Sequence, residues 1–205
     1  RGGLLSFSIL ASIYFSSNGI RTIMSALNRN TPKEKRRGLL KNRVVAIGIT
    51  FSSILVLISL ITALFFIHQL ELGWQEENFL YGWFRSTLIF LIEAGTLAFG
   101  LLILISGIYY FAPSQRKLVK QFHFFSPGAM LATFLIITTA LLFQFYINNI
   151  FAYNSVYGSI GAIIALLLLL YFTATCIIIG FELNISINKA VNSKLDSRQF
   201  ILKKL

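Results

Sequence analysis

The sequence predicts an all-α, polytopic transmembrane helical bundle, and three observations carry that prediction. Hydrophobic residues make up 56% of the 205 residues and charged residues only 12%, whereas soluble domains have about 45–50% and about 25%. The mean hydropathy is +0.76. Long uncharged stretches alternate with short charged segments. Because a lipid-facing surface needs few polar groups and helices satisfy their own backbone there, we expect four clear spans plus a partial span at the N-terminus.

The first two clear spans follow from stretch length, since about 20 apolar residues cross the hydrocarbon core. Residues 44–70 contain no Asp, Glu, Lys or Arg. Residues 86–112 contain only Glu93 and end before Pro113, a residue that favours a helix end just before it. Both stretches are therefore expected to be transmembrane helices.

The last two clear spans share one uncharged block, residues 124–181. The block is too long for one span and fits two helices joined by a turn. A group of asparagines, Asn148, Asn149 and Asn154, interrupts the apolar pattern and marks the turn. We expect helices over residues 127–150 and 156–181.

The N-terminal segment, residues 4–28, leaves two alternatives open. It is apolar at first but then carries Ser16, Asn18 and Arg21. It is either part of a transmembrane helix whose start is cut away or an amphipathic helix lying in the interface. The chain begins at Arg1 without a methionine, so we expect it to be an N-terminally incomplete part of a longer protein, forming one transmembrane domain over residues 1–205.

The positive charges predict the orientation. The loop 29–43 and the tail 185–205 are strongly basic, the loop 113–126 carries three basic residues, and the loop 71–85 between them carries three glutamates against one arginine. Basic loops stay on the cytoplasmic side. We therefore expect the loops 29–43 and 113–126 and the C-terminus in the cytoplasm, and the loop 71–85 outside.

The same pattern accounts for the net charge of +11 without nucleic acid as a partner. The charges fall where membrane topology requires them, and no nucleic-acid-binding module accompanies them. Membrane lipids are the expected partners, with anionic headgroups attracted to the basic cytoplasmic loops. The sequence predicts no particular oligomeric state.

Small and polar residues recur at helical spacing along each span. Such faces either let helices approach closely or line a cavity or substrate path, and both interpretations stay open. The faces include Gly48, Ser52, Ser59 and Ala63; Ser86, Glu93, Gly100 and Gly107; Thr133, Ala140, Gln144 and Asn148; and Ala165, Cys176 and Gly180.

Glu93 is the sharpest single candidate, because a carboxylate inside a span costs about 2.5–3.5 kcal/mol on insertion scales. One interpretation is a substrate or proton site formed with Arg85, Arg21 and Gln144. The other is a hydrogen-bonded or protonated glutamate that ties helices together. Near the end of the last span, Glu182 and Asn184 are expected to anchor or cap against the basic loops.

Enzymatic motifs are missing from the sequence. It contains no glycine-rich phosphate loop followed by lysine, no nucleophile elbow and no pair of histidines at metal-ligand spacing. One cysteine and two histidines do not predict a metal site. We expect no catalytic residues, no metal and no cofactor.

The chain resembles the YihY/BrkB family of bacterial inner-membrane proteins over nearly its whole length. The resemblance rests on SSNGIRTIMSALN at 16–28, RVVAIGIT at 43–50, YYFAP at 109–113, SPGA at 126–129, YGSIGA at 157–162 and GFELN at 180–184. The matched positions that the family motifs single out are Asn28, Arg43, Pro113, Pro127, Gly128, Tyr157, Gly158, Gly161, Gly180, Glu182 and Asn184.

The resemblance implies about six spans with both termini in the cytoplasm, in the inner membrane of a bacterium. The family carries a virulence-factor label and an older ribonuclease BN label, and the residues give the second no support because no metal-binding carboxylates or acid–base pair gather in this sequence. We expect an inner-membrane protein that transports or flips an amphipathic or lipid-like substrate. The alternative is a non-transporting scaffold involved in envelope integrity or virulence.

Overall fold

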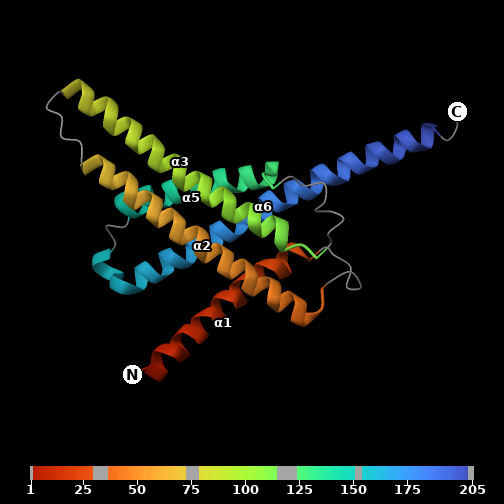
Figure 1. Ribbon diagram of the computed structural model, residues 1–205, viewed down its shortest axis with the longest axis horizontal. Coiled ribbons are helices and arrows are strands. Elements are labelled where there is room, and N and C mark those ends of the chain that lie inside the picture. The colour runs from red at the N-terminus through yellow and green to blue at the C-terminus, as the bar shows by residue number, and fades with distance from the viewer. Residues whose placement is uncertain (1, 30–36, 73–78, 115–123, 151–153, 203–205) are drawn as a thin grey trace.

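The computed structural model describes residues 2–29, 37–72, 79–114, 124–150 and 154–202. Within these ranges all regular secondary structure is helical, which confirms the predicted fold class. Figure 1 shows the five helices, which are α1 (Gly2–Leu27), α2 (Leu39–Leu72), α3 (Phe79–Phe111), α5 (Pro127–Ile150) and α6 (Asn154–Leu202).

All five helices are long and apolar enough to cross a membrane. Most of their large apolar side chains are exposed rather than packed inside the chain, for example Phe90 at 66% and Leu141 at 61%. In water such a surface would be strongly unfavourable, whereas in a bilayer it faces lipid. The chain is a multi-pass membrane protein.

The helix limits correct three predicted loop boundaries. The α5 helix has the predicted bounds, but α2 already begins at Leu39, α3 begins at Phe79, and α6 continues through the predicted tail to Leu202. No proline interrupts these extensions, and lysine, arginine and glutamate are good helix formers. Charge therefore did not mark where the helices end.

The length of α6 shows the same point. Its 49 residues span about 74 Å at 1.5 Å per residue, far more than the hydrocarbon core of about 30 Å. Figure 1 shows its C-terminal part extending beyond the other helices. The basic tail is thus helical to Leu202, and α6 is longer than a membrane span requires.

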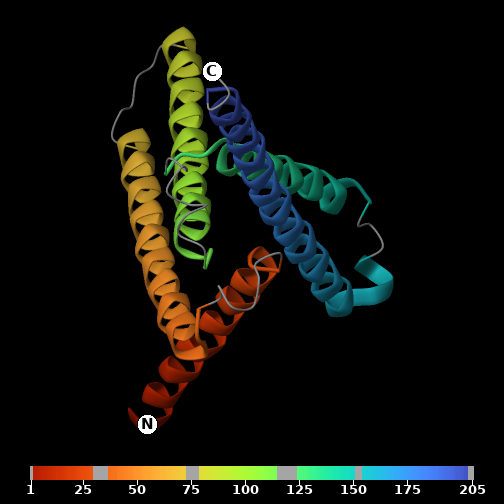
Figure 2. The ribbon, with the colours of Figure 1, turned by 90° about the vertical axis from the view of Figure 1, so that its right-hand side faces the viewer.

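The helices form two pairs joined at one end. The antiparallel α2 and α3 lie side by side, α5 packs mainly on α6, and α1 crosses the start of α2 (Figures 1 and 2). The first half of α1 projects away from the others in Figure 2, and its side chains Leu4 and Phe7 are more than two-thirds exposed.

The buried core lies where α1 and α3 end and where α2 and α5 begin. Met24, Ala46, Ile108, Ala129 and Phe181 belong to it, one from each helix. We call this end of the bundle the basic end, because the basic segments 29–43 and 116–120 flank these helix ends in the sequence. The polar contacts described below also gather there.

The small residues divide between the two alternatives. A side chain at Gly100 would collide with Leu60, and side chains at Gly128 and Gly180 would collide with each other's backbone, so these glycines permit close packing. By contrast, a Cβ at Gly48 or Gly107 would meet nothing within 4 Å. The faces of α2 and α3 that carry these two glycines are therefore open at those points.

Candidate functional site

The first polar cluster of the basic end joins the start of α5 to α6. Ser126 and Pro127 begin α5 in a favourable order, with serine as the N-cap and proline in the first turn. The Gly128 amide donates to Asn184 Oδ1 at 2.8 Å, and Asn184 Nδ2 donates to Ser126 Oγ at 2.7 Å. Asn184 is 1% exposed, and both the oxygen and the nitrogen of its amide are hydrogen-bonded to the start of α5.

The α3 helix is attached to the same junction through Tyr109. Its hydroxyl donates to the Ile177 carbonyl of α6, and its ring packs against Phe181 with centroids 5.5 Å apart. A backbone carbonyl accepts from a side chain only where the helices come close, and Gly180 provides that approach. These contacts hold three helices together and leave only a small cavity of about 10 Å³ beside Tyr109 and Asn184.

A second cluster binds the end of α3. Asn28 Nδ2 donates to the Ala112 carbonyl at 3.1 Å, and its Oδ1 accepts from the Ser114 amide at 2.7 Å. Arg37 donates from its two terminal nitrogens to the carbonyls of Phe111 and Pro113, both at 2.8 Å. The carbonyls left unpaired where a helix ends are thus satisfied from two other segments.

Arg43 links α1 to α2. Its guanidinium lies 4.2 Å from the centroid of the Tyr14 ring and donates to Asn18 Oδ1 at 3.1 Å. A cation over an aromatic face is attractive, so this family-motif arginine has a structural role in positioning the two helices.

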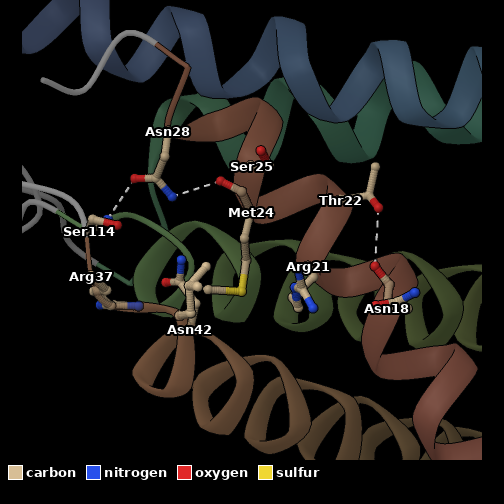
Figure 3. A pocket seen from close by; sticks show the side chains of 10 residues that line it. Asn18, Arg21, Thr22, Met24, Ser25, Asn28, Arg37, Asn42 and Ser114 are labelled. Atoms are coloured by element: carbon tan, nitrogen blue, oxygen red, sulfur yellow. Dashed lines mark hydrogen bonds between the residues drawn. The ribbon is translucent and has the colours of Figure 1, made fainter. Parts of the chain in front are cut away.

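Between these links lies a polar pocket of about 520 Å³, a size typical of ligand sites. Figure 3 shows Met24 of α1 pointing toward Asn42 of α2, with Arg21 beside them. The pocket is lined from α1, from the first turn of α2 and from residues that flank α1, α2 and the end of α3, namely Asn18, Arg21, Thr22, Met24, Ser25, Asn28, Arg37, Leu39, Asn42 and Ser114.

The pocket carries positive charge and an unsatisfied polar group. Arg21 forms no hydrogen bond or ion pair with the described residues, and a guanidinium offers five N–H donors. The Oδ1 atom of Asn42 is buried without a hydrogen-bond partner. Among the described residues that line the pocket, none is acidic. Such a pocket favours an anionic ligand with hydrogen-bonding groups.

The structure brings only one of the four predicted substrate-site residues into this pocket, namely Arg21. Glu93 is half-buried on α3 and forms no ion pair with Arg21 or Arg85. Arg85 is also half-buried but interacts elsewhere, and Gln144 is exposed on α5. The expected pairing of Glu93 with an arginine is therefore not formed, and a substrate or proton role for Glu93 stays a prediction.

The family-motif residues fall mainly at the two junctions. Pro113 is buried at the end of α3, Gly161 is buried in α6, and Glu182 is exposed. Tyr157 and Gly158 lie in the first turns of α6, but their surroundings lie outside the described residues. Asn184 does cap a helix, but its partner is the start of α5 rather than a basic loop, because α6 continues past it as a helix.

Sequence reasoning missed Asn18, Arg37 and Asn42 as pocket residues. Arg37 was counted only as one of several charges in a basic loop, and its carbonyl partners are 74 and 76 residues away. The only available signal was Pro113, which leaves carbonyls unpaired at the end of the preceding helix. Among the described residues, no group of three or more His, Cys, Asp or Glu could hold a metal ion.

The bundle and its pocket define a multi-pass membrane protein with a cationic polar site at one end of its helices. The family model described as "Virulence factor BrkB" matches residues 1–200, so the chain belongs to this family and the predicted resemblance is confirmed. "Putative ribonuclease-like protein YfkH" of Bacillus subtilis (strain 168) is 32% identical over 194 residues, covering 92% of this chain and 67% of that protein. No solved structure matches the chain significantly.

Proposed function

We propose that this protein binds an amphipathic, lipid-like molecule at the basic end and transports or flips it across the membrane. The observation that carries the proposal is the cationic pocket of about 520 Å³ at the ends of three membrane-spanning helices. A cation near a membrane surface attracts anionic headgroups, and Arg21 has no ion-pair partner among the residues that the structure describes. We propose that this end and the C-terminus lie on the cytoplasmic side of a bacterial inner membrane, because basic loops stay on that side.

The residues of the pocket favour binding over hydrolysis. The relative YfkH is named ribonuclease-like, but cleavage of RNA needs a general base and acid or metal-binding carboxylates. The polar groups that the described residues bring to the pocket are guanidinium, amide and hydroxyl groups, and none of these residues is a carboxylate, a histidine or a lysine. Arginine keeps its proton at neutral pH, so it can hold an anion but cannot take up a proton from a nucleophile.

A lipid-movement assay in proteoliposomes tests the proposal. The probe is fluorescent phosphatidylglycerol in both leaflets, with dithionite added outside to quench the accessible fraction. Liposomes with the full-length protein should lose the inner-leaflet signal faster than empty liposomes. Arg21→Gln should slow that loss by about tenfold or more, since hydrogen bonds to charged groups contribute about 1.5–3 kcal/mol and 1.4 kcal/mol is tenfold.

Lys41→Gln is the matched control for Arg21→Gln. Lys41 is an exposed cation in the first turn of α2 and does not line the pocket. The substitution Lys41→Gln removes one positive charge from the same end of the bundle but leaves the pocket intact, so the rate of lipid movement should equal that of the wild type. Equal slowing in both variants would assign the effect to surface charge rather than to the pocket, and no movement by the wild type would favour the scaffold alternative.

Glu93→Gln belongs in the same assay as a separate question. We expect it to abolish movement without unfolding the protein. A half-buried carboxylate that has no ion-pair partner among the described residues is costly inside a span, and such residues usually mark substrate or proton pathways. A wild-type rate in this variant would remove Glu93 from the mechanism and leave it as a helix-packing residue.

A further inference from the structure

A second cavity lies between α2 and α3, close to the polar pocket but with the opposite character. It has a volume of about 340 Å³. We call it the α2–α3 groove, and its walls include Val45, Gly48 and Val56 of α2 and Leu104 and Gly107 of α3. None of its described lining residues is charged. An apolar groove on the surface of a membrane protein can take up an acyl chain of a lipid from the bilayer.

The two glycines make the groove possible. Added side chains at Gly48 and Gly107 would meet nothing within 4 Å, so α2 and α3 do not close over these positions. Farther along the same helix pair, the side chain of Leu60 of α2 occupies the space beside Gly100 of α3. The pair is therefore packed at one level and open at another, and the open level is the one near the basic end.

The dimensions of the groove fit a chain within one leaflet. Val45 to Val56 covers about 16 Å along α2 at 1.5 Å per residue, close to the roughly 15 Å of hydrocarbon in one leaflet. Val45 lies six residues into α2, or about 9 Å along the helix, and the headgroup layer on each side of a bilayer is about 5–8 Å thick. With the start of α2 at the outer edge of this layer, the groove lies at the depth of acyl chains and the polar pocket at the depth of headgroups.

The two cavities are neighbours along the chain. Asn42 of the pocket and Val45 of the groove are one turn apart on α2. Arg37 lines the pocket and donates to the backbone carbonyl of Phe111, and Phe111 itself lines the groove. One molecule with a charged head and an apolar tail can therefore contact both cavities.

We infer that the pocket and the groove together bind one anionic phospholipid, with its phosphodiester at Arg21 and an acyl chain between Gly48 and Gly107. The inference deepens the proposed function, since it uses the same pocket and names its ligand. Arginine suits phosphate through parallel N–H donors. Moving an acyl chain from the bilayer into the groove gains little hydrophobic free energy, because both surroundings are apolar. The groove therefore positions the tail, and the cation selects the headgroup.

Photo-crosslinking in nanodiscs tests this inference directly. The full-length protein is placed in phosphatidylcholine nanodiscs containing a minor fraction of phosphatidylglycerol with a diazirine on one acyl chain, and labelled peptides are mapped by mass spectrometry. Label should concentrate on residues 45–56 and 103–111. A phosphatidylcholine probe should label these segments less, and Arg21→Gln should remove the difference between the two probes.

Filling the groove provides a second measurement with a matched control. Gly48→Leu and Gly107→Leu should lower labelling of the groove by phosphatidylglycerol, because the leucine occupies the space of the tail. Gly95→Leu is the control, since Gly95 of α3 is also free of neighbours within 4 Å and does not line the groove. It should label like the wild type, and thermal unfolding of all three variants checks that they fold.

The outcomes separate this inference from the proposed function. Labelling spread evenly over all lipid-facing helices, with no dependence on headgroup or on Gly48, would mean ordinary boundary lipid and would overturn the inference, even if the protein moves lipid in proteoliposomes. Headgroup-dependent labelling of the groove by a protein that moves no lipid would support the inference and refute transport.

Discussion

Replacing Gly128 with alanine should destabilise the crossing of α5 and α6. The added methyl group would be driven into the Gly180 carbonyl and the Asn184 side chain. Overpacking costs about 1–3 kcal/mol, and a backbone neighbour yields less than a flexible side chain. Separation of the helices also weakens the bonds from Gly128 to Asn184 and from Asn184 to Ser126.

The expected loss follows from these contacts. Two interhelical hydrogen bonds contribute about 0.6 kcal/mol each in a membrane, so with overpacking the free energy of unfolding should fall by about 2–4 kcal/mol. Denaturation by SDS in mixed micelles, followed by tryptophan fluorescence, measures it. Gly95→Ala is the control and should change little, because nothing lies within 4 Å of its Cβ position. A Gly128→Ala value within about 0.5 kcal/mol of the wild type, the range of neutral surface changes, would refute the close crossing.

Three further changes test the other contacts of the basic end. Asn28→Ala removes the acceptor of the Ser114 amide and should lower the free energy of unfolding by about 1–3 kcal/mol, the cost of a buried group left unpaired; an unchanged SDS midpoint would contradict the contact. Tyr109→Phe loses the bond to the Ile177 carbonyl and should cost about 0.6 kcal/mol and at most about 1.7 in the same titration, whereas a larger loss would show that the ring had repacked. Arg37→Lys replaces the two terminal N–H donors of a guanidinium with a single ammonium. Hydrogen–deuterium exchange of the amides in the last turn of α3, measured by mass spectrometry, should therefore accelerate. Wild-type protection would mean that one carbonyl contact suffices.

The limits of the helices show how far local pattern reached. Residues 127–150 were predicted with the bounds that α5 has, because Ser126 and Pro127 form a local start signal and asparagines interrupt the apolar pattern at its end. The end of α6 was missed, since the helix continues through the charged residues after Asn184 to Leu202. Hydropathy reports the solvent around a helix, whereas helix ends depend on backbone hydrogen bonding.

The sequence by itself determined the membrane class, the helical fold and the family, because these depend on composition, on short-range periodicity and on contiguous motifs. The sequence also singled out Arg21, but as an ion-pair partner of Glu93. The two residues form no ion pair in the structure. Only the tertiary structure decided that Gly128 packs while Gly107 opens a groove, and that Arg37 reaches a carbonyl 76 residues away. The physical reason is that a glycine or an arginine has the same local pattern in either setting, and the neighbour that gives it a role comes from another helix.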